Sequence, residues 1–345
     1  MRTLAVSTTL KFEASHVVEE PCKFFYEQRA STVIFNLINN FSVPGPFLLP
    51  ANVCPIIPLI LLKANRKFEF VDISSETYCI DHKLLKKRWA RRDERPSGLI
   101  YVRSYGAVLD TSKLFAELKS ISPQSLIIDD RCLCAPCFEC TLPPHTDAVV
   151  FSTGYAKYVD IGFGGYGAIR GGVTYNRTGL EFDEVDLDRV THDYKRCLSG
   201  REKYDYKDCN WLDARKPQLS WEAYRVLVER ELEKSQYQKA RINAIYKSEI
   251  SWIAQLTESF QAWRFNVLVK NPPAVLSCIQ RAGFFASSHY ESLAGVFDAG
   301  YAPEAERVKS QVINLFNDRY FDENRAILLT EFLIKLRAEY PEYFI

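Results

Sequence analysis

The stretch that decides the fold reads Phe151-Ser-Thr-Gly-Tyr-Ala-Lys157-Tyr-Val-Asp-Ile-Gly162-Phe-Gly164-Gly165. An apolar run ends at Phe151, a polar loop carries Lys157, and a glycine-rich turn leads into another apolar run. Glycines allow backbone to pass close to a flat ligand, and the hydroxyl and N–H groups before the lysine can bind a phosphate. A lysine amine kept partly out of water in such a loop becomes a nucleophile, because desolvation lowers its pKa. Lys157 is therefore the first candidate for catalysis.

Short apolar runs on both sides of this stretch alternate with segments of helical periodicity. Runs of this length without polar alternation are typical of parallel strands that are buried on both faces. The expected strands are 47–50, 68–72, 99–102, 126–129, 147–151 and 167–170, and the expected helices are 30–41, about 55–62 and 112–120. The alternation predicts an α/β fold, namely a three-layer domain with a mostly parallel sheet.

The character of the chain changes after about residue 180. Residues 181–210 are charged and aromatic, and we expect an irregular excursion there. A long helix is predicted over 220–246, and from residue 263 short strands and helices alternate up to a last helix at 324–340. The predicted organisation is a lead-in over 1–22, a large α/β domain over 23–215, and a linking helix with a small α+β domain over 216–345.

Composition excludes several classes of protein. The 345 residues carry a net charge of +1, whereas proteins dedicated to nucleic acid usually show a basic face. The most apolar stretch, 47–62, is interrupted by prolines and is too short to span a membrane. The first twenty residues show no secretory pattern, and ten cysteines in this length are expected to be reduced thiols. We therefore expect a cytoplasmic protein that binds neither nucleic acid nor a membrane.

Two further groups of residues complete a constellation around Lys157. Asp129 and Asp130 end a predicted strand, where α/β sheets place their ligands. Ala30 and Ser31 lie at the start of a predicted helix, whose N–H groups and dipole favour a phosphate. An amine, a buried carboxylate and a phosphate site are what pyridoxal 5′-phosphate (PLP) requires, because the carboxylate keeps the pyridine nitrogen protonated. The sequence thus predicts PLP bound to Lys157 as a Schiff base.

The spacing of this segment resembles that of the DegT/StrS-like family of PLP-dependent sugar aminotransferases, which have the aspartate aminotransferase fold (fold type I). In that family a lysine follows a serine by five positions, and glycines follow the lysine at five, seven and eight positions. Ser152, Lys157, Gly162, Gly164 and Gly165 stand at these spacings. The resemblance implies a homodimeric aminotransferase that moves an amino group from a small-molecule donor to a keto-sugar or related keto compound.

The resemblance also implies roles for individual residues. It assigns the pyridine nitrogen to Asp130, with Asp129 as the alternative, and the phosphate to Ser152 together with the helix start at Ala30 and Ser31. Cys54 stands where the family usually stacks an aromatic ring on PLP. Asn210 corresponds to an asparagine that reaches the phosphate across a dimer.

The chain departs from the family pattern at three positions around the expected ring. Besides Cys54, Leu133 replaces a frequent glutamine, and Phe163 replaces a glutamate that is common between the glycines. Because of these departures, the sequence predicts the acceptor only as a keto-sugar or a related keto compound.

Other interpretations remain open. A PLP-dependent lyase or dehydratase would need the same lysine, and both aspartates could simply cap a loop. Cys132, Cys134, Cys137 and Cys140 lie close enough in sequence to hold zinc or an iron–sulfur cluster in a non-catalytic relative, although buried free cysteine is also a common core residue. We therefore expect no metal. His289 and Tyr290 are candidates to line the site from a loop of the small domain.

Overall fold

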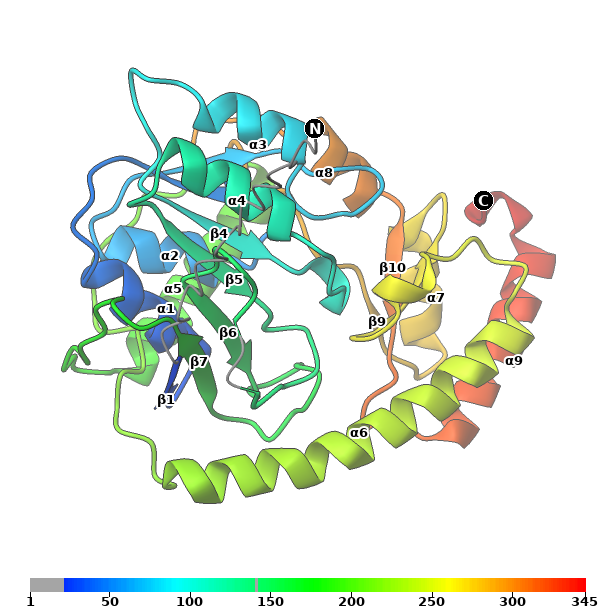
Figure 1. Ribbon diagram of the computed structural model, residues 1–345. Coiled ribbons are helices and arrows are strands. Elements are labelled where there is room, and N and C mark those ends of the chain that lie inside the picture. Colours follow the sequence, from blue (N-terminus) through cyan, green and yellow to red (C-terminus); the bar gives the residue numbers. More distant parts are fainter. Residues whose placement is uncertain (1–21, 140–141) are drawn as a thin grey trace, which may run out of the picture.

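The computed structural model describes residues 22–139 and 142–345 (Figure 1). A seven-stranded sheet has the order β1-β7-β6-β5-β4-β2-β3, and β7 runs in the direction opposite to the other six strands. Its strands are β1 (Lys23–Glu27), β2 (Phe47–Pro50), β3 (Phe68–Val71), β4 (Gly98–Val102), β5 (Leu126–Asp130), β6 (Ala148–Ser152) and β7 (Gly165–Ile169). The predicted mostly parallel sheet is confirmed, whereas β1 was not foreseen.

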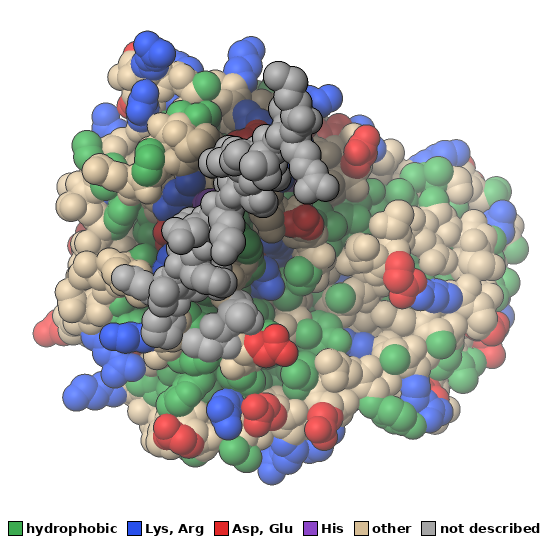
Figure 2. Space-filling model, in the orientation of Figure 1, with side chains coloured by type: hydrophobic (Ala, Val, Ile, Leu, Met, Phe, Trp, Pro, Cys, Tyr) green, Lys and Arg blue, Asp and Glu red, His purple; other side chains and the backbone are tan. Residues whose placement is uncertain are grey.

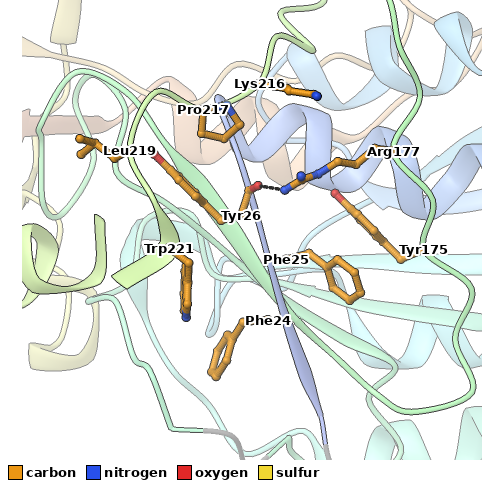
Figure 3. Close-up of a pocket in the computed structure, with 9 residues that line it drawn as sticks. All are labelled: Phe24, Phe25, Tyr26, Tyr175, Arg177, Lys216, Pro217, Leu219 and Trp221. Carbon is orange, nitrogen blue, oxygen red and sulfur yellow. Dashed lines mark hydrogen bonds between the residues drawn. The ribbon is translucent and has the colours of Figure 1, made fainter. Parts of the chain in front are cut away.

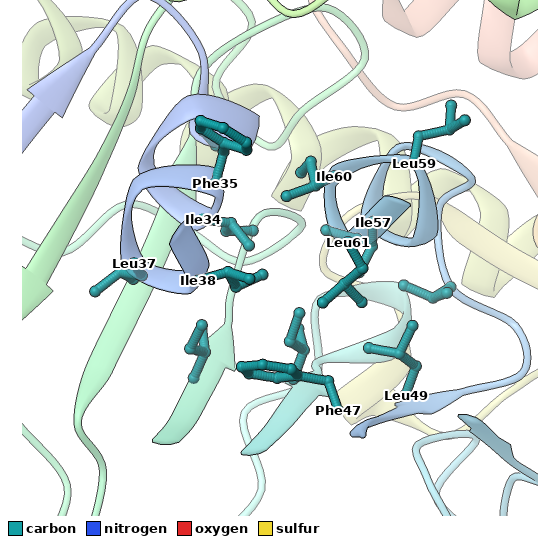
Figure 4. Packing of buried hydrophobic residues seen from close by; sticks show 14 of the residues in the cluster. Ile34, Phe35, Leu37, Ile38, Phe47, Leu49, Ile57, Leu59, Ile60 and Leu61 are labelled. Carbon is teal, nitrogen blue, oxygen red and sulfur yellow. The ribbon is translucent and has the colours of Figure 1, made fainter. Parts of the chain in front are cut away.

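Helices cover both faces of this sheet, which makes the predicted three layers. On one face α1 (Ala30–Asn39) and α2 (Ile56–Lys63) pack on Phe47 and Leu49 of β2, as Figure 4 shows. On the other face α3 (His82–Trp89) and α4 (Ser112–Ile121) bury Leu48 of the same strand. Successive residues of a strand point to opposite faces, so apolar runs without alternation fill two cores at once.

The charged region after residue 180 contains a regular helix, α5 (Glu184–Gly200), so the expectation of an irregular excursion is wrong. The Asp183 carboxylate caps it by accepting the N–H of Val185 at 2.9 Å. Only Val190 and Cys197 are fully buried along it. A narrow apolar stripe among charged residues hides the helical period, because most positions of this helix face water.

A single helix of 29 residues, α6 (Trp221–Glu249), leads from the large sheet to the C-terminal part of the chain (Figure 1). There an antiparallel sheet has the order β8-β10-β9, with β8 (Phe265–Leu268), β9 (Ala286–Ser287) and β10 (Val312–Leu315). Helices α7 (Pro272–Arg281), α8 (Pro303–Lys309) and α9 (Glu323–Glu339) accompany it. The second, smaller α+β part is confirmed, and the domain boundaries near residues 23 and 216 stay predictions.

Three short 3-10 turns complete the regular structure: η1 (Ser104–Gly106), η2 (Glu258–Phe260) and η3 (Pro341–Tyr343). On the face shown in Figure 2, positive and negative side chains are interspersed. Within residues 22–139 and 142–345, no helix is both long and apolar enough to cross a membrane.

Candidate cofactor site

A cavity of about 180 Å³ lies beyond the carboxyl ends of β5 and β6. These strands are parallel neighbours, so their ends meet at one edge of the sheet, where such folds bind ligands. The predicted residues that line the cavity are Ala30, Ser31, Cys54, Asp130, Ser152 and Lys157. Four segments that are far apart in sequence therefore meet at one point.

The two adjacent aspartates point to opposite faces of the sheet. Asp130 lines the cavity, is 4% exposed, and accepts the Cys132 N–H at 2.9 Å. Burial raises the pKa of Asp130, while its hydrogen bonds with Cys132 and the positive charge of Lys157 oppose that rise. Asp129 lies outside the cavity lining, where Arg103 and Arg131 hold it in ion pairs at 2.6 and 2.8 Å.

Helix α1 presents its N-terminus to the cavity. It begins without a side-chain cap and without an acidic residue in its first turn, so its first N–H groups and the positive end of its dipole are available to an anion. Gly165 fixes this position, because a Cβ there would lie 2.2 Å from the backbone nitrogen of Ala30. The glycine of the sequence motif thus serves the close approach of the helix to β7.

Lys157 lies half-buried in a loop between β6 and β7. The carboxylate of Asp160 accepts the N–H groups of Ala156 at 2.9 Å and Gly162 at 3.0 Å, which folds the loop back on itself. Gly162 has a φ of +83°, a backbone conformation that strongly favours glycine. The loop therefore holds the lysine at the cavity by backbone contacts rather than by regular structure.

Cys132, Arg29 and Tyr155 are among the lining residues to which the sequence assigned no cofactor role. Cys132 follows Asp130 directly, and burial together with the negative charge of Asp130 raises the pKa of its thiol well above the ordinary value. Arg29 donates from Nη1 to the Gly162 carbonyl at 2.8 Å, and its guanidinium lies 5.7 Å from the ring centre of Tyr155. A cation beside a helix N-terminus was visible in the sequence as Arg29, but only the fold shows that it meets the lysine loop.

Other predicted residues lie outside the lining. Asn210 is exposed, and its N–H donates to Asp186 at 2.7 Å, so it does not reach the cavity of its own chain. The dense surroundings of His289 and the charges of Lys309, Arg264 and Lys157 lower its pKa to about 4. Its ring is therefore neutral at pH 7 and close enough to Lys157 to feel its charge.

Tyr290 also neighbours the site. Burial raises the pKa of its hydroxyl, and the neighbouring Asp130 carboxylate raises it further. Among the departures from the family pattern, Leu133 is 5% exposed and packs in a cluster with Trp263, and Phe163 lies against Tyr224. Both replacements are thus apolar packing residues.

The described cysteines of the cluster do not converge. Cys132 lines the cavity, Cys134 is buried in another core and Cys137 is exposed, while Cys140 lies outside the described residues. No group of three metal-ligating side chains occurs within residues 22–139 and 142–345. Eight described cysteines are free thiols, but Cys22 is disulfide-bonded, which departs from the expectation of reduced thiols throughout.

A larger cavity of about 510 Å³ lies against β1, and its lining differs from that of the first cavity (Figure 3). Aromatic rings line much of it, and the cations among its described lining residues are Arg177 and Lys216. Arg177 is already engaged, because it pairs with Glu27 at 2.8 Å and donates to the Tyr26 carbonyl at 2.7 Å. Among its described lining residues there is no carboxylate, so the smaller cavity stays the candidate site.

Comparison with solved structures places the fold. Spr1654 of Streptococcus pneumoniae, in its PMP form, has 16% identity and a TM-score of 0.67 over 92% of this chain and 88% of that chain. Helicobacter pylori PseC, an aminotransferase involved in the biosynthesis of pseudoaminic acid, has 14% identity and a TM-score of 0.66 over 92% and 87%. CalS13, a sugar aminotransferase from Micromonospora echinospora, has 17% identity and a TM-score of 0.63 over 90% and 87%.

No protein-family model and no curated protein matches the sequence. At these identities the structural likeness establishes the fold. The fold that the DegT/StrS-like resemblance implied is therefore confirmed.

Proposed function

We propose that this protein is a PLP-dependent aminotransferase in which Lys157 carries the cofactor as a Schiff base. One observation carries the proposal: a single cavity joins the Lys157 side chain, the buried Asp130 carboxylate and the N-terminus of α1. These groups are an amine, a carboxylate and a helix N-terminus that can bind a phosphate. The fold is similar to that of Spr1654, whose structure is in the PMP form. A metal-binding relative would not need this set, whereas a PLP-dependent lyase or dehydratase would need all of it.

The residues of the cavity fit PLP by their chemistry. Asp130 is nine-tenths buried, and none of the ion pairs among the described residues involves it. A protonated pyridine nitrogen would supply the cation that this carboxylate lacks. Ser152, 7% exposed, and the free end of α1 would bind the phosphate. Cys54 would lie against the ring in place of an aromatic side chain.

Bound PLP supplies an electron sink that stabilises a carbanion on the substrate. The work of the chain's own residues follows from their positions. With its amine free, Lys157 would be the base that takes a proton from the substrate carbon bearing the amino group and the acid that gives that proton back. Asp130 would hold the ring nitrogen positive, with Asp129 as the alternative. Ser152, Ala30 and Ser31 would keep the cofactor in place by its phosphate.

The finer parts of the proposal concern substrate, assembly and compartment. We propose a keto-sugar or related keto compound as acceptor. Two proteins of similar fold support this proposal: CalS13 is a sugar aminotransferase, and PseC is an aminotransferase involved in the biosynthesis of pseudoaminic acid. We also propose a homodimer, in which the exposed Asn210 of one chain reaches the phosphate site of the other. The eight free thiols support a cytoplasmic location, and the Cys22 disulfide speaks against it.

The proposal is tested on the purified full-length chain with added PLP. Borohydride reduction followed by peptide mapping should place a pyridoxyl group on Lys157, and a group on another residue would overturn the assignment. An amino donor alone, drawn from a panel of common amino acids, should then bleach the visible band. If no donor bleaches it, elimination by a lyase or dehydratase becomes the better function. A colourless protein with stoichiometric zinc or iron would favour the metal-binding alternative.

A further inference from the structure

The indole of Trp263 reaches from the C-terminal part of the chain to the residue just before Lys157. Its Nε1–H donates to the Ala156 carbonyl at 2.7 Å, and the side chain of Trp263 is 2% exposed. Ala156 has a φ of +56°, a left-handed conformation that costs a residue with a Cβ about 1–2 kcal/mol. That conformation needs contacts to maintain it, and the Trp263 hydrogen bond is one of them.

A buried lysine supports Trp263 from behind. Lys239, on α6, is 3% exposed and donates from Nζ to the Trp263 carbonyl at 2.8 Å and to Asn317 Oδ1 at 2.9 Å. The same Nζ lies 5.1 Å from the ring centre of Tyr158. Lys239 therefore contacts Tyr158 directly and Ala156 through Trp263, and these two residues flank Lys157 on either side.

The surroundings of Lys239 explain why it can serve as a support in either charge state. Burial and the Arg264 cation together lower its pKa to about 7, against the opposing effect of the Asp318 carboxylate. Its acceptors are a carbonyl and an amide oxygen, which both the ammonium and the neutral amine can donate to. No carboxylate bonds it directly in the described structure, so the interaction is a positional one rather than an ion pair.

We propose that Trp263 and Lys239 are positioning residues for the Lys157 loop and set how well that loop receives PLP. The inference rests on the proposed role of Lys157. Neither residue lines the cavity, so each acts through the backbone beside the lysine. Through them, α6 and the segment before β8 fix the direction in which the lysine leaves the loop.

The decisive variant is Trp263→Phe, which keeps an aromatic ring and removes the N–H donor. The matched control is Trp252→Phe, because Trp252 also belongs to the C-terminal core but contacts Phe344 and Arg337 instead of the loop. Lys239→Met keeps the apolar stem and removes the donor to Trp263. Three quantities are measured: the PLP dissociation constant, the pH midpoint of the visible band, and hydrogen exchange of the peptide 153–161 without cofactor.

Trp263→Phe should weaken PLP binding about two- to tenfold, as expected for one hydrogen bond. It should also shift the pH midpoint and speed exchange of the peptide, while Trp252→Phe changes none of these. Equal values for the two tryptophan variants in all three measurements would overturn the inference. Faster exchange only in Trp263→Phe, in a chain that binds no PLP at all, would instead reject the proposed function and keep the positioning role. A Lys239→Met protein with wild-type exchange would remove Lys239 from the proposal.

Discussion

Two neighbouring aspartates at the end of β5 have the same side chain and nearly the same burial, yet opposite surroundings. Asp129 is fully buried between Arg103 and Arg131, and the guanidinium of Arg103 also bonds the Leu109 carbonyl at 2.6 Å. Asp130 faces the cavity and Lys157, and among the described residues its carboxylate is hydrogen-bonded to Cys132. A buried charge must be compensated. Two arginines of the chain compensate the charge of Asp129, whereas no ion pair among the described residues compensates that of Asp130.

The comparison teaches that burial of a carboxylate alone does not mark a candidate site, whereas burial beside a cavity without an ion-paired cation does. Asp129 ties β5 to the turn after β4 through its ion pair with Arg103, so we expect a structural role for it. Asp130 is the member of the pair that a ligand would complete. Variants on the two sides of the sheet, at Asp129 and around Asp130, should separate the two roles.

The largest effect is expected from removing the lysine that the cavity-side aspartate faces. Lys157→Ala should lower amino transfer by about 10²- to 10⁴-fold, because it removes the general acid–base. The variant should also yield no pyridoxyl peptide after borohydride reduction. Lys216→Ala, an exposed lysine at the other cavity, is the control and should behave as wild type. Undiminished transfer in Lys157→Ala would end the proposed function.

Breaking the buried ion pair between Asp129 and Arg103 should destabilise the fold. Asp129→Asn leaves Arg103 buried without its counter-charge, so the free energy of unfolding should fall by about 3–5 kcal/mol. Urea titration measures this. Asp93→Asn breaks only an exposed ion pair with Arg91 and should change stability little. Asp129→Asn protein that remains folded should still bind PLP.

Changing Asp130, which lines the cavity, should affect the rate of amino transfer rather than folding. Asp130→Asn should lower kcat about 10²- to 10³-fold, the usual cost of one preorganised electrostatic partner. The protein without cofactor should remain as stable as wild type or become more stable, since an uncompensated buried charge is removed. If Asp130→Asn turned over normally while Asp129→Asn lost the visible band, the pyridine role would belong to Asp129.

The smallest effect is the pH dependence of stability without cofactor. Burial raises the pKa of Asp130, so above about pH 4, where an unfolded aspartate ionises, the folded state binds more protons than the unfolded state. The free energy of unfolding should therefore fall as pH rises until the folded carboxyl also ionises. Asp130→Asn should abolish this component. A difference between wild type and variant that stays constant with pH would contradict the raised pKa.

Much of the fold could be predicted from the sequence because its signals are local. The apolar runs of β2, β4, β5 and β6, the periodicity of α1 and the helix-forming composition of α6 predicted these elements. Helix α5 was missed, because its narrow apolar stripe around Val190 and Cys197 is diluted by charges. Strand β1 was missed because its pairing with β7 is a contact over a long separation in sequence.

The sequence by itself determined the lysine loop, the glycines and the aspartate pair, because each is a local spacing with its own chemical requirement. It could not decide which aspartate faces the cavity: Leu126, Ile127 and Ile128 are apolar on both faces of β5, so no alternation marks the side on which Asp130 lies. Only the tertiary structure decided that. It also brought Trp263 and Lys239 to the backbone beside Lys157, since contacts between residues so distant in sequence arise from packing alone.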